Sequence, residues 1–299
     1  MISVSNSRTP AIVRALQKAL RVPLKLIDLA SLLPAEIQFK VNQFKHANAL
    51  SAVSSMDAEI VKSLKREGVF ITSLEALGIP DTAAMLQAAE SILPKIADQP
   101  GNTGYDIHAS QDLVLERPEL FAWGLHDRIL NIAEASIGIP AAFNDIHIRR
   151  DFANGVQSGS RLWHVDSYDH RILRIIIYLS NVSKTGGAHE YIPRQKSRFW
   201  VTVLEHFGTI PDKVMEMLGL QKHVKSCPGP KGTVIFSMTS RVLHRGTVPQ
   251  DSERYTLIYN YNSRHPKRPQ EASPRVPKER LVRVAQQFPK RQQDCMLWM

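Results

Sequence analysis

The 299-residue sequence has few cysteines, no long hydrophobic run and no surplus of acidic residues. Its two cysteines, Cys227 and Cys295, are too few for a disulfide framework or a four-thiolate zinc site, although one disulfide between them remains open. We therefore expect a reducing compartment, the cytoplasm. The mean hydropathy is −0.20, and no apolar run approaches the ~18 residues of a membrane span. Hydrophobic residues make up 43% of the chain and charged residues 22%, as in globular rather than disordered proteins.

Basic residues exceed acidic ones, 38 to 28, and the excess gathers at the two ends of the chain. From Arg264 onward there are nine basic and three acidic residues, which indicates a solvated, proline-interrupted tail rather than a nucleic-acid-binding arm. The first 27 residues hold five basic residues and no acidic one. We interpret that segment as an amphipathic surface helix, with an organellar targeting segment as the alternative. The positive charge suits a small-molecule substrate that is anionic or carrier-linked.

Helical periodicity dominates the first half of the chain and short β-prone segments dominate the second. Residues 9–63 are expected to be mainly helical, and a short helix in 57–68 is expected to end at Gly68. Further helices are expected at 81–95 and 126–137, with a β-prone segment at 69–74. The expected strands lie in 143–152, 161–168, 173–182, 197–204, 232–238, 239–244 and 254–261. These patterns predict a mainly β fold with flanking helices. The predicted division is a helical N-terminal extension at 1–56, a β domain at 57–263, and a basic C-terminal tail at 264–299 with room for a short helix.

Three residues form the pattern that carries chemistry: His164 and Asp166 in RLWHVDSY, and His244 in RVLHRGT. On a strand the side chains at i and i+2 point to the same face, so His164 and Asp166 can converge on one ion. A third ligand from a distant strand completes the set. Two imidazoles and one carboxylate are the ligands of non-haem Fe(II) oxygenases. The alternative is a local His–Asp pair on a surface strand, which the ordered occurrence of His244 and Arg254 disfavours.

Arg254 lies ten residues beyond His244, with Thr256 two positions further on and so on the same strand face. A guanidinium pairs with a carboxylate through two hydrogen bonds, and a neighbouring hydroxyl supplies one more donor. The two residues therefore predict a carboxylate-binding site beside the metal.

In their order along the chain, these segments resemble the phytanoyl-CoA dioxygenase-like family of Fe(II)- and 2-oxoglutarate-dependent oxygenases. The resemblance covers about residues 57–262 and departs from the family at YIPRQKS, where relatives often carry a Pro-Gly-Ser-His-like turn. The matching segments are LKREGVFITSLEAL, WHVD, RIIIYLSNVS, GGAHEYIP, GTVIF, LHRG and RYT.

The resemblance implies a double-stranded β-helix, a jelly-roll or cupin-like core. It implies Fe(II) bound by His164, Asp166 and His244, and a distal carboxylate of 2-oxoglutarate bound by Arg254 and Thr256. With O2, such an enzyme hydroxylates or otherwise oxidises an unactivated C–H bond of a small-molecule metabolite and releases succinate and CO2. Asp166 favours hydroxylation, because related halogenases carry a small residue at that position.

Three further residues are candidates for contacts to the substrate. His147 and Arg149 share one face of the predicted strand at 143–152, and Arg174 lies on the strand that begins at residue 173. A buried ion pair is the alternative role for Arg149.

Two functions other than a small-molecule oxygenase are compatible with part of the sequence pattern. One is a β-helix protein that binds a metal or ligand without catalysis, which the intact set of His164, Asp166, His244 and Arg254 disfavours. The other is an oxidative demethylase of nucleic acid, which needs a surface for base stacking. The tail offers only Phe288 and Trp298 as aromatic side chains, so a nucleic-acid substrate is disfavoured.

Overall fold

The computed structural model describes residues 33–48, 50–51, 53–97, 104–205, 208–272 and 276–298. Its helices are α2 (Leu33–His46), α3 (Ser55–Arg66), α4 (Leu74–Leu77), α5 (Thr82–Ala97), α6 (Gln111–Leu115), α7 (Pro118–Gly124), α8 (Asp127–Ile137), α9 (Arg194–Leu204), α10 (Asp212–Met217), α11 (Pro269–Ala272), α12 (Lys278–Ala285) and α13 (Lys290–Met296), with 3₁₀ turns η1 (Gly159–Arg161) and η2 (Gln221–His223). Its strands are β1 (Val69–Ser73), β2 (Asp106–His108), β3 (Ala141–Asp151), β4 (Leu173–Tyr178), β5 (His189–Tyr191), β6 (Lys225–Cys227), β7 (Thr233–Ser237), β8 (His244–Gly246) and β9 (Arg254–Ser263).

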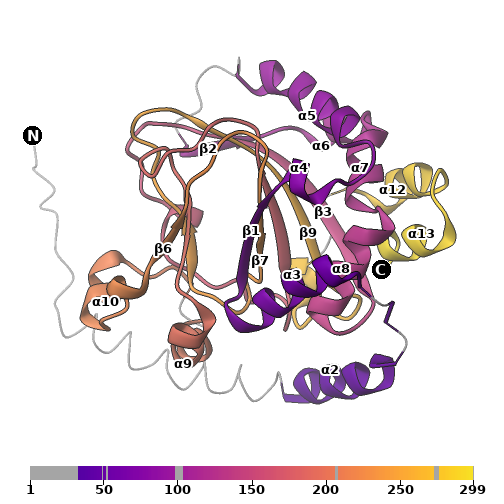
Figure 1. Cartoon of the computed structure of the whole chain (residues 1–299), viewed down its shortest axis with the longest axis horizontal. Helices are drawn as coiled ribbons and strands as arrows, with labels where there is room; N and C mark the ends of the chain where they lie inside the picture. Colours follow the sequence, from indigo (N-terminus) through magenta and orange to yellow (C-terminus); the bar gives the residue numbers. More distant parts are fainter. Residues whose placement is uncertain are drawn as a thin grey trace, which may run out of the picture.

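The strands form two antiparallel sheets. The larger has the order β1-β7-β4-β9-β3-β2 and the smaller the order β6-β5-β8. Figure 1 looks into the space between them, with β1, β7 and β9 of the larger sheet on one side and β6 of the smaller on the other. Facing antiparallel sheets are consistent with the predicted jelly-roll core. More described residues lie in helices than in strands, so the chain is a mixed helix and sheet protein rather than a mainly β one.

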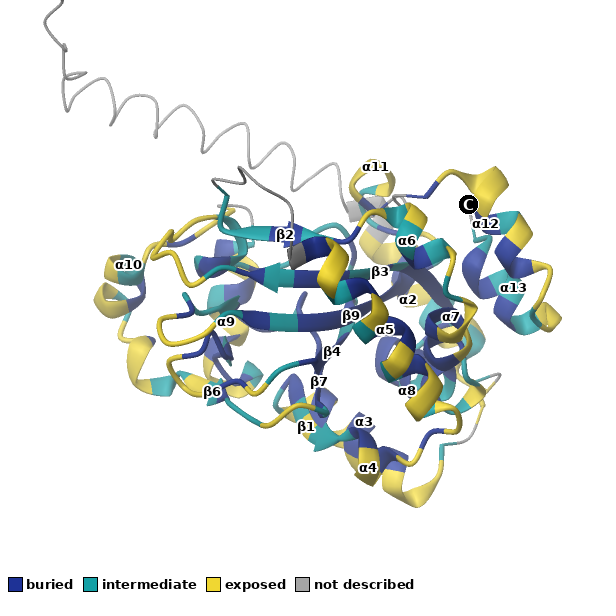
Figure 2. Cartoon of the chain, turned by 90° about the horizontal axis from the view of Figure 1, so that it is seen from above, coloured by how far each residue is buried: buried dark blue, intermediate teal, exposed yellow. Residues whose placement is uncertain are grey.

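Helices cover the outer face of the larger sheet, as Figures 1 and 2 show for α5, α7 and α8. Alternate residues of β9 point outward, and Leu257, Tyr259 and Tyr261 join the main hydrophobic core with residues of these helices. Trp123 of α7 stacks on Tyr259 with ring centroids 5.2 Å apart. The intervening residues of β9 therefore face the smaller sheet, and this alternation directs polar side chains into the space between the sheets.

Several predicted elements are present in the structure. The helical segment that ends at Gly68 is α3, the helix predicted at 81–95 is α5, and the helix predicted at 126–137 is α8. The β-prone segment at 69–74 is β1, which pairs with β7 at the edge of the larger sheet. Part of the region predicted to be helical, residues 9–32, lies outside the described residues.

Three of the predicted strands are wrong in whole or in part. Residues 197–204 lie in helix α9, where Ser197, Val201 and Leu204 are buried at helical spacing. Residues 161–168 form only isolated bridges, at Trp163 and His164, and residues 239–243 form a turn before β8. Aromatic and β-branched residues favour strands in general, but the packing of the buried face decides the outcome.

The C-terminal region is not a solvated tail. Helices α12 and α13 contribute Leu281, Val284 and Cys295 to the main hydrophobic core. Arg291 of α13 forms ion pairs of 2.9 Å with both Asp127 and Glu134 of α8. The basic residues of this region therefore include one that docks the last helix. Both cysteines are free and buried, and the described helices include none with the length and hydropathy to cross a bilayer.

Candidate metal centre

The structure brings together His164, Asp166 and His244 in one compact group. Their ligand atoms all lie within 4.8 Å of one another. The Nε2 atom of His164 is 3.8 Å from Asp166 Oδ1, and Nε2 of His244 is 3.9 Å from Asp166 Oδ2. The backbones of His164 and His244 exchange two N–H···O hydrogen bonds of 3.1 Å, and the N–H of Asp166 donates to Thr239 O at 3.2 Å. Backbone pairing thus holds the first and last residue of the group in register across 80 positions of sequence.

Both imidazoles present the same ring nitrogen to the centre of the group. Nδ1 of His164 lies 2.8 Å from Leu162 O, and Nδ1 of His244 lies 3.2 Å from Val242 O. A carbonyl oxygen only accepts, so Nδ1 carries the proton in each ring and Nε2 keeps its lone pair. Nε2 of His244 is buried and has no hydrogen-bond partner among the described residues. An orphaned acceptor of this kind is what a metal-ligating histidine shows when its other nitrogen is fixed by a carbonyl.

The charge states also suit a cation. Burial lowers the pKa of His164 and lowers that of His244 well below its ordinary value, so both rings are neutral. Burial alone would raise the pKa of Asp166, but Arg174, His244 and His164 outweigh it and the pKa is lowered. Arg174 Nη2 lies 2.8 Å from Asp166 Oδ2. Two neutral imidazoles and one ionised carboxylate are the protonation states that metal binding requires.

The group lies at a small cavity of about 40 Å³ between the two sheets. The larger sheet contributes side chains from β3, β4 and β9, and the smaller sheet from β5 and β8. The lining residues are Arg149, Ser160, His164, Arg174, Ile176, His189, Thr239, His244, Gly246, Arg254, Thr256 and Ile258.

Arg254 and Thr256 both line this cavity, as the alternation of the strand predicts. Nε and Nη2 of Arg254 donate to Asp151 Oδ2 at 3.1 and 2.9 Å, and Nη1 donates to Gly187 O. An arginine side chain has five N–H donors, so two remain after these three bonds. A Cβ atom at Gly246 would lie 2.7 Å from Nη2 of Arg254, which explains why a glycine faces the guanidinium. The Oγ1 atom of Thr256 is buried and has no partner among the described residues.

The three candidate substrate residues have different positions. Arg149 lines the cavity, but its Nη2 also lies 2.8 Å from Asp151 Oδ1, so Arg149 and Arg254 share one buried carboxylate. Arg174 lines the cavity and pairs with Asp166. His147 is not among the lining residues, and its Nε2 lies 2.8 Å from Asp145 Oδ2.

His189 is the main cavity residue that was not among the candidates from the sequence. It is 4% exposed, and burial followed by the charge of Arg254 lowers its pKa to about 3. Its ring centroid lies 5.7 Å from that of His244. His189 pairs with Gly246 across β5 and β8, and both line the cavity. Only the register between the three-residue strands β5 and β8 places His189 in the cavity, and local sequence patterns do not specify that register.

No protein-family model matches the chain, and no curated protein matches its sequence. Solved structures match its fold. The non-haem α-ketoglutarate-dependent carbocyclase SnoK from nogalamycin biosynthesis has a TM-score of 0.52 and 20% sequence identity, covering 71% of this chain and 87% of SnoK. EctD from S. alaskensis, in a structure with bound iron, has a TM-score of 0.50 and 16% identity, covering 71% of this chain and 77% of EctD. These likenesses show a shared fold.

Proposed function

We propose that this chain is an Fe(II)- and 2-oxoglutarate-dependent oxygenase that acts on a small molecule. The convergence of two neutral imidazole nitrogens and one carboxylate at a cavity between the sheets carries the proposal. Two imidazoles and a carboxylate on one face leave coordination positions open for a cosubstrate and O2. The names of the similar structures, an α-ketoglutarate-dependent carbocyclase and an iron-bound EctD, agree with this chemistry.

The residues of the site fit the metal and the cosubstrate. His164, Asp166 and His244 hold the iron, because their ligand atoms already converge and the rings are neutral. The two remaining N–H donors of Arg254 and the unpartnered hydroxyl of Thr256 bind the distal carboxylate of 2-oxoglutarate. When bound, iron, 2-oxoglutarate and O2 supply the oxidising chemistry, with release of succinate and CO2. Arg174 keeps Asp166 ionised through its ion pair with the carboxylate.

More specifically, we propose that the chain belongs to the phytanoyl-CoA dioxygenase-like branch and that it hydroxylates a C–H bond. This proposal is supported by the order of the motifs and by the carboxylate at Asp166. Arg149 and Arg174 are the proposed contacts to the substrate, since both line the cavity. His147 lies on the same face of β3 as Arg149 and pairs with Asp145. We further propose that residues 57–263 form the oxygenase domain, flanked by the N-terminal extension and by the C-terminal helices.

The decisive experiment needs no substrate. Anaerobic protein is titrated with Fe(II) and then with 2-oxoglutarate, and the visible charge-transfer band of the chelated keto acid is recorded. The band is expected in the wild-type protein and lost in His244→Ala, because one of the three ligands is removed. His223→Ala is the matched control, since His223 lies on η2 and does not line the cavity. A wild-type protein that binds Fe(II) but gives no band with 2-oxoglutarate would reject the proposed cosubstrate.

A further inference from the structure

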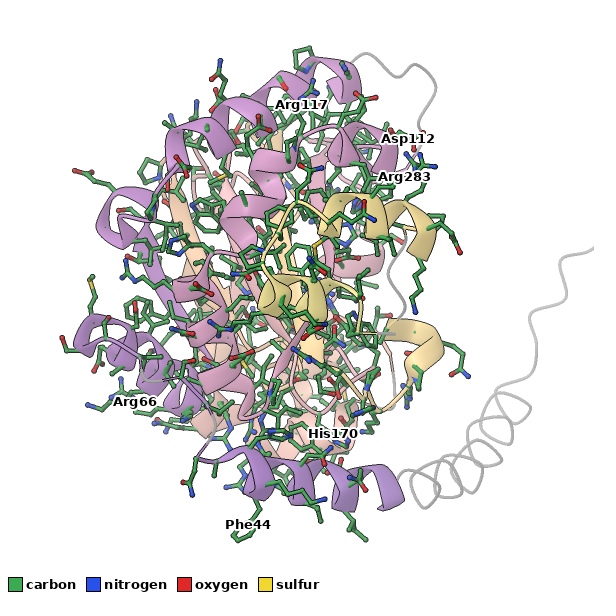
Figure 3. All side chains as sticks on the ribbon, turned by 90° about the vertical axis from the view of Figure 1, so that its right-hand side faces the viewer. Phe44, Arg66, Asp112, Arg117, His170 and Arg283 are labelled. Atoms are coloured by element: carbon green, nitrogen blue, oxygen red, sulfur yellow. The ribbon has the colours of Figure 1, made fainter. Side chains whose placement is uncertain are left out.

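A second cavity, of about 420 Å³, lies apart from the candidate metal centre and shares no lining residue with it. Helix α2, helix α9 and the turn after β7 contribute most of its walls. Figure 3 shows His170, one of its lining residues, against α2. The lining residues are Glu36, Phe39, Lys40, Asp169, His170, Arg171, Arg194, Arg198, Val201, Thr202, Glu205, Ser240, Arg241 and Lys267. A volume of this size is typical of sites for small molecules.

Four arginines dominate the cavity: Arg171 before β4, Arg194 and Arg198 on α9, and Arg241 in the turn between β7 and β8. In the described part of the chain, no carboxylate oxygen lies within 4.0 Å of any of their guanidinium nitrogens. Arg171 donates only to His170 O at 3.3 Å, and Arg194 to Lys65 O at 2.8 Å. Clustered guanidinium groups without a paired carboxylate are costly, because like charges repel and arginines stay protonated.

Together with burial, this repulsion lowers the pKa values of arginines in the cluster. Burial, followed by the charges of Arg171, Arg194 and Arg198, lowers the pKa of Arg241 to about 9. Burial and then the charge of Arg194 lower the pKa of Arg171 to about 10. The neighbouring positive charges therefore disfavour the protonated forms of Arg171 and Arg241. A bound anion would oppose this repulsion.

The acidic residues around the cavity are directed to other partners. Glu36 lies 2.8 Å from Nδ1 of His170. Asp169 accepts the backbone N–H groups of His170 at 2.7 Å and of Ser263 at 2.6 Å. Glu205 lies 3.6 Å from the ammonium group of Lys267. Glu36 and Asp169 still act on Arg171 through their charge. Among the described residues, none of the three acids lies within ion-pair distance of the four guanidinium groups, and the basic lining residues outnumber the acidic ones.

The placement of Arg194 and Arg198 on α9 is unfavourable for the helix itself. The two residues are four positions apart and so face the same side, where like charges repel. Arg194 is the first residue of α9, and the first turn of this helix has no acidic residue. The N-terminal end of a helix carries a partial positive charge and favours negative groups. An anion in the cavity would complement both the helix end and the two guanidinium groups.

We propose that this cavity binds a small molecule that carries a phosphate group, at a site separate from the metal centre. A phosphate has close to two negative charges and three acceptor oxygens, which match several guanidinium groups better than the single charge of a carboxylate. Phe39 and Val201 give the cavity an apolar part that can contact an organic group attached to the phosphate. The site requires neither iron nor 2-oxoglutarate, so it goes beyond the proposed function and is tested independently of it.

The test is calorimetric titration of the full-length chain with inorganic phosphate, phenyl phosphate and benzoate. The variants are Arg241→Gln in the turn after β7 and Arg198→Gln on α9, which is exposed and therefore leaves folding intact. Arg283→Gln is the matched control, because Arg283 is exposed on α12 and lies outside the cavity. Each cluster variant is expected to raise the Kd for phenyl phosphate about tenfold, since one charge-assisted hydrogen bond is lost. The control should bind like the wild type, and added salt should weaken binding.

The three probes distinguish the sources of the phosphate group. Tighter binding of phenyl phosphate than of inorganic phosphate indicates an organic phosphate ester, and equal binding indicates free phosphate. The proposal is overturned by a wild-type protein that binds neither phosphate, by unchanged Kd values in both cluster variants, or by benzoate binding as tightly as phenyl phosphate.

Discussion

At the scale of a single side chain, Thr256 allows the proposed contact with 2-oxoglutarate to be tested on its own. Its hydroxyl is buried and unpartnered, so Thr256→Val should leave the free energy of unfolding unchanged or slightly higher. If the hydroxyl donates to 2-oxoglutarate, the half-saturating 2-oxoglutarate concentration should rise about five- to tenfold, equivalent to about 1 kcal/mol. Denaturant unfolding and titration of the charge-transfer band measure the two effects.

Thr233→Val is the contrasting variant. The hydroxyl of Thr233 donates to Pro230 O at 2.7 Å, so its loss should destabilise the protein by about 1 kcal/mol and leave 2-oxoglutarate binding unchanged. Equal 2-oxoglutarate binding by wild type and Thr256→Val would remove Thr256 from the cosubstrate site.

Single residues also show where sequence reasoning succeeds and where it stops. Strand alternation predicts that Arg254 and Thr256 share a face, and both line the cavity. The same reasoning says nothing of Asp151, which holds Arg254 from a strand 103 positions earlier. That contact depends on the pairing of β3 with β9, a non-local property. An arginine that is predicted to bind a ligand can therefore already have an internal carboxylate as a partner.

At the scale of elements, a substitution at the end of α3 tests how closely this helix packs against the turn that leads to the candidate metal centre. Gly68 has a φ of +88°, and a Cβ atom there would lie 2.3 Å from Cγ1 of Val242, two residues before His244. Gly68→Ala should therefore add steric overlap to backbone strain. Gly219 at the end of α10 has a φ of +66° but open space around it, so Gly219→Ala should show the strain alone.

We expect Gly68→Ala to be less stable than Gly219→Ala by about 1–3 kcal/mol, the usual cost of overpacking. Denaturant unfolding at one temperature measures the difference. Equal losses in the two variants would mean that α3 and the turn at Val242 adjust freely to each other. Only the end of this helix was predictable from the sequence, through the glycine after the last apolar residue. Its contact with Val242 was not.

Helix α9 shows why an element is sometimes misassigned. The segment SRFWVTVL is rich in residues that favour strands, yet Phe199 is 68% exposed and Val203 38% exposed on a helix. The buried side is formed by Ser197, Val201 and Leu204, a helical period that only the tertiary partner reveals. The segment begins at the point where the sequence departs from the resembled family. Helix α9 supplies Arg194 and Arg198, two of the four arginines of the 420 Å³ cavity.

At the scale of the whole molecule, substitutions in α12 test whether the C-terminal region is an integral part of the fold or a tail. Leu281 of α12 is buried in the main core, whereas Arg283 on the same helix is exposed. Leu281→Ala should lower the free energy of unfolding by about 2–5 kcal/mol. Arg283→Ala should change it by less than about 0.5 kcal/mol. If both changes prove equally mild in denaturant unfolding, the helix is not part of the cooperative core.

The charge of this region explains why it was predicted to be solvated. Nine basic residues in the sequence give no sign of which ones find partners. Arg291 finds Asp127 and Glu134 on a helix more than 150 positions earlier, and composition does not report such a pairing. Leu281 and Val284 have helical spacing, but Pro289 separates them from Cys295 on the next helix, and each segment is too short to identify alone.

The pairing of β3 with β9 has a consequence for how the chain is made. Asp151 meets its partner Arg254 only 103 positions later, and β4 is flanked by β7 and β9. A ribosome synthesises β3 and β4 long before the strands that cover their edges exist. Until then these apolar strands present open hydrogen-bonding edges, which template aggregation. Translation products that stop before β9 should therefore be insoluble or bound by chaperones. The three candidate metal ligands can come together only after His244 has been synthesised.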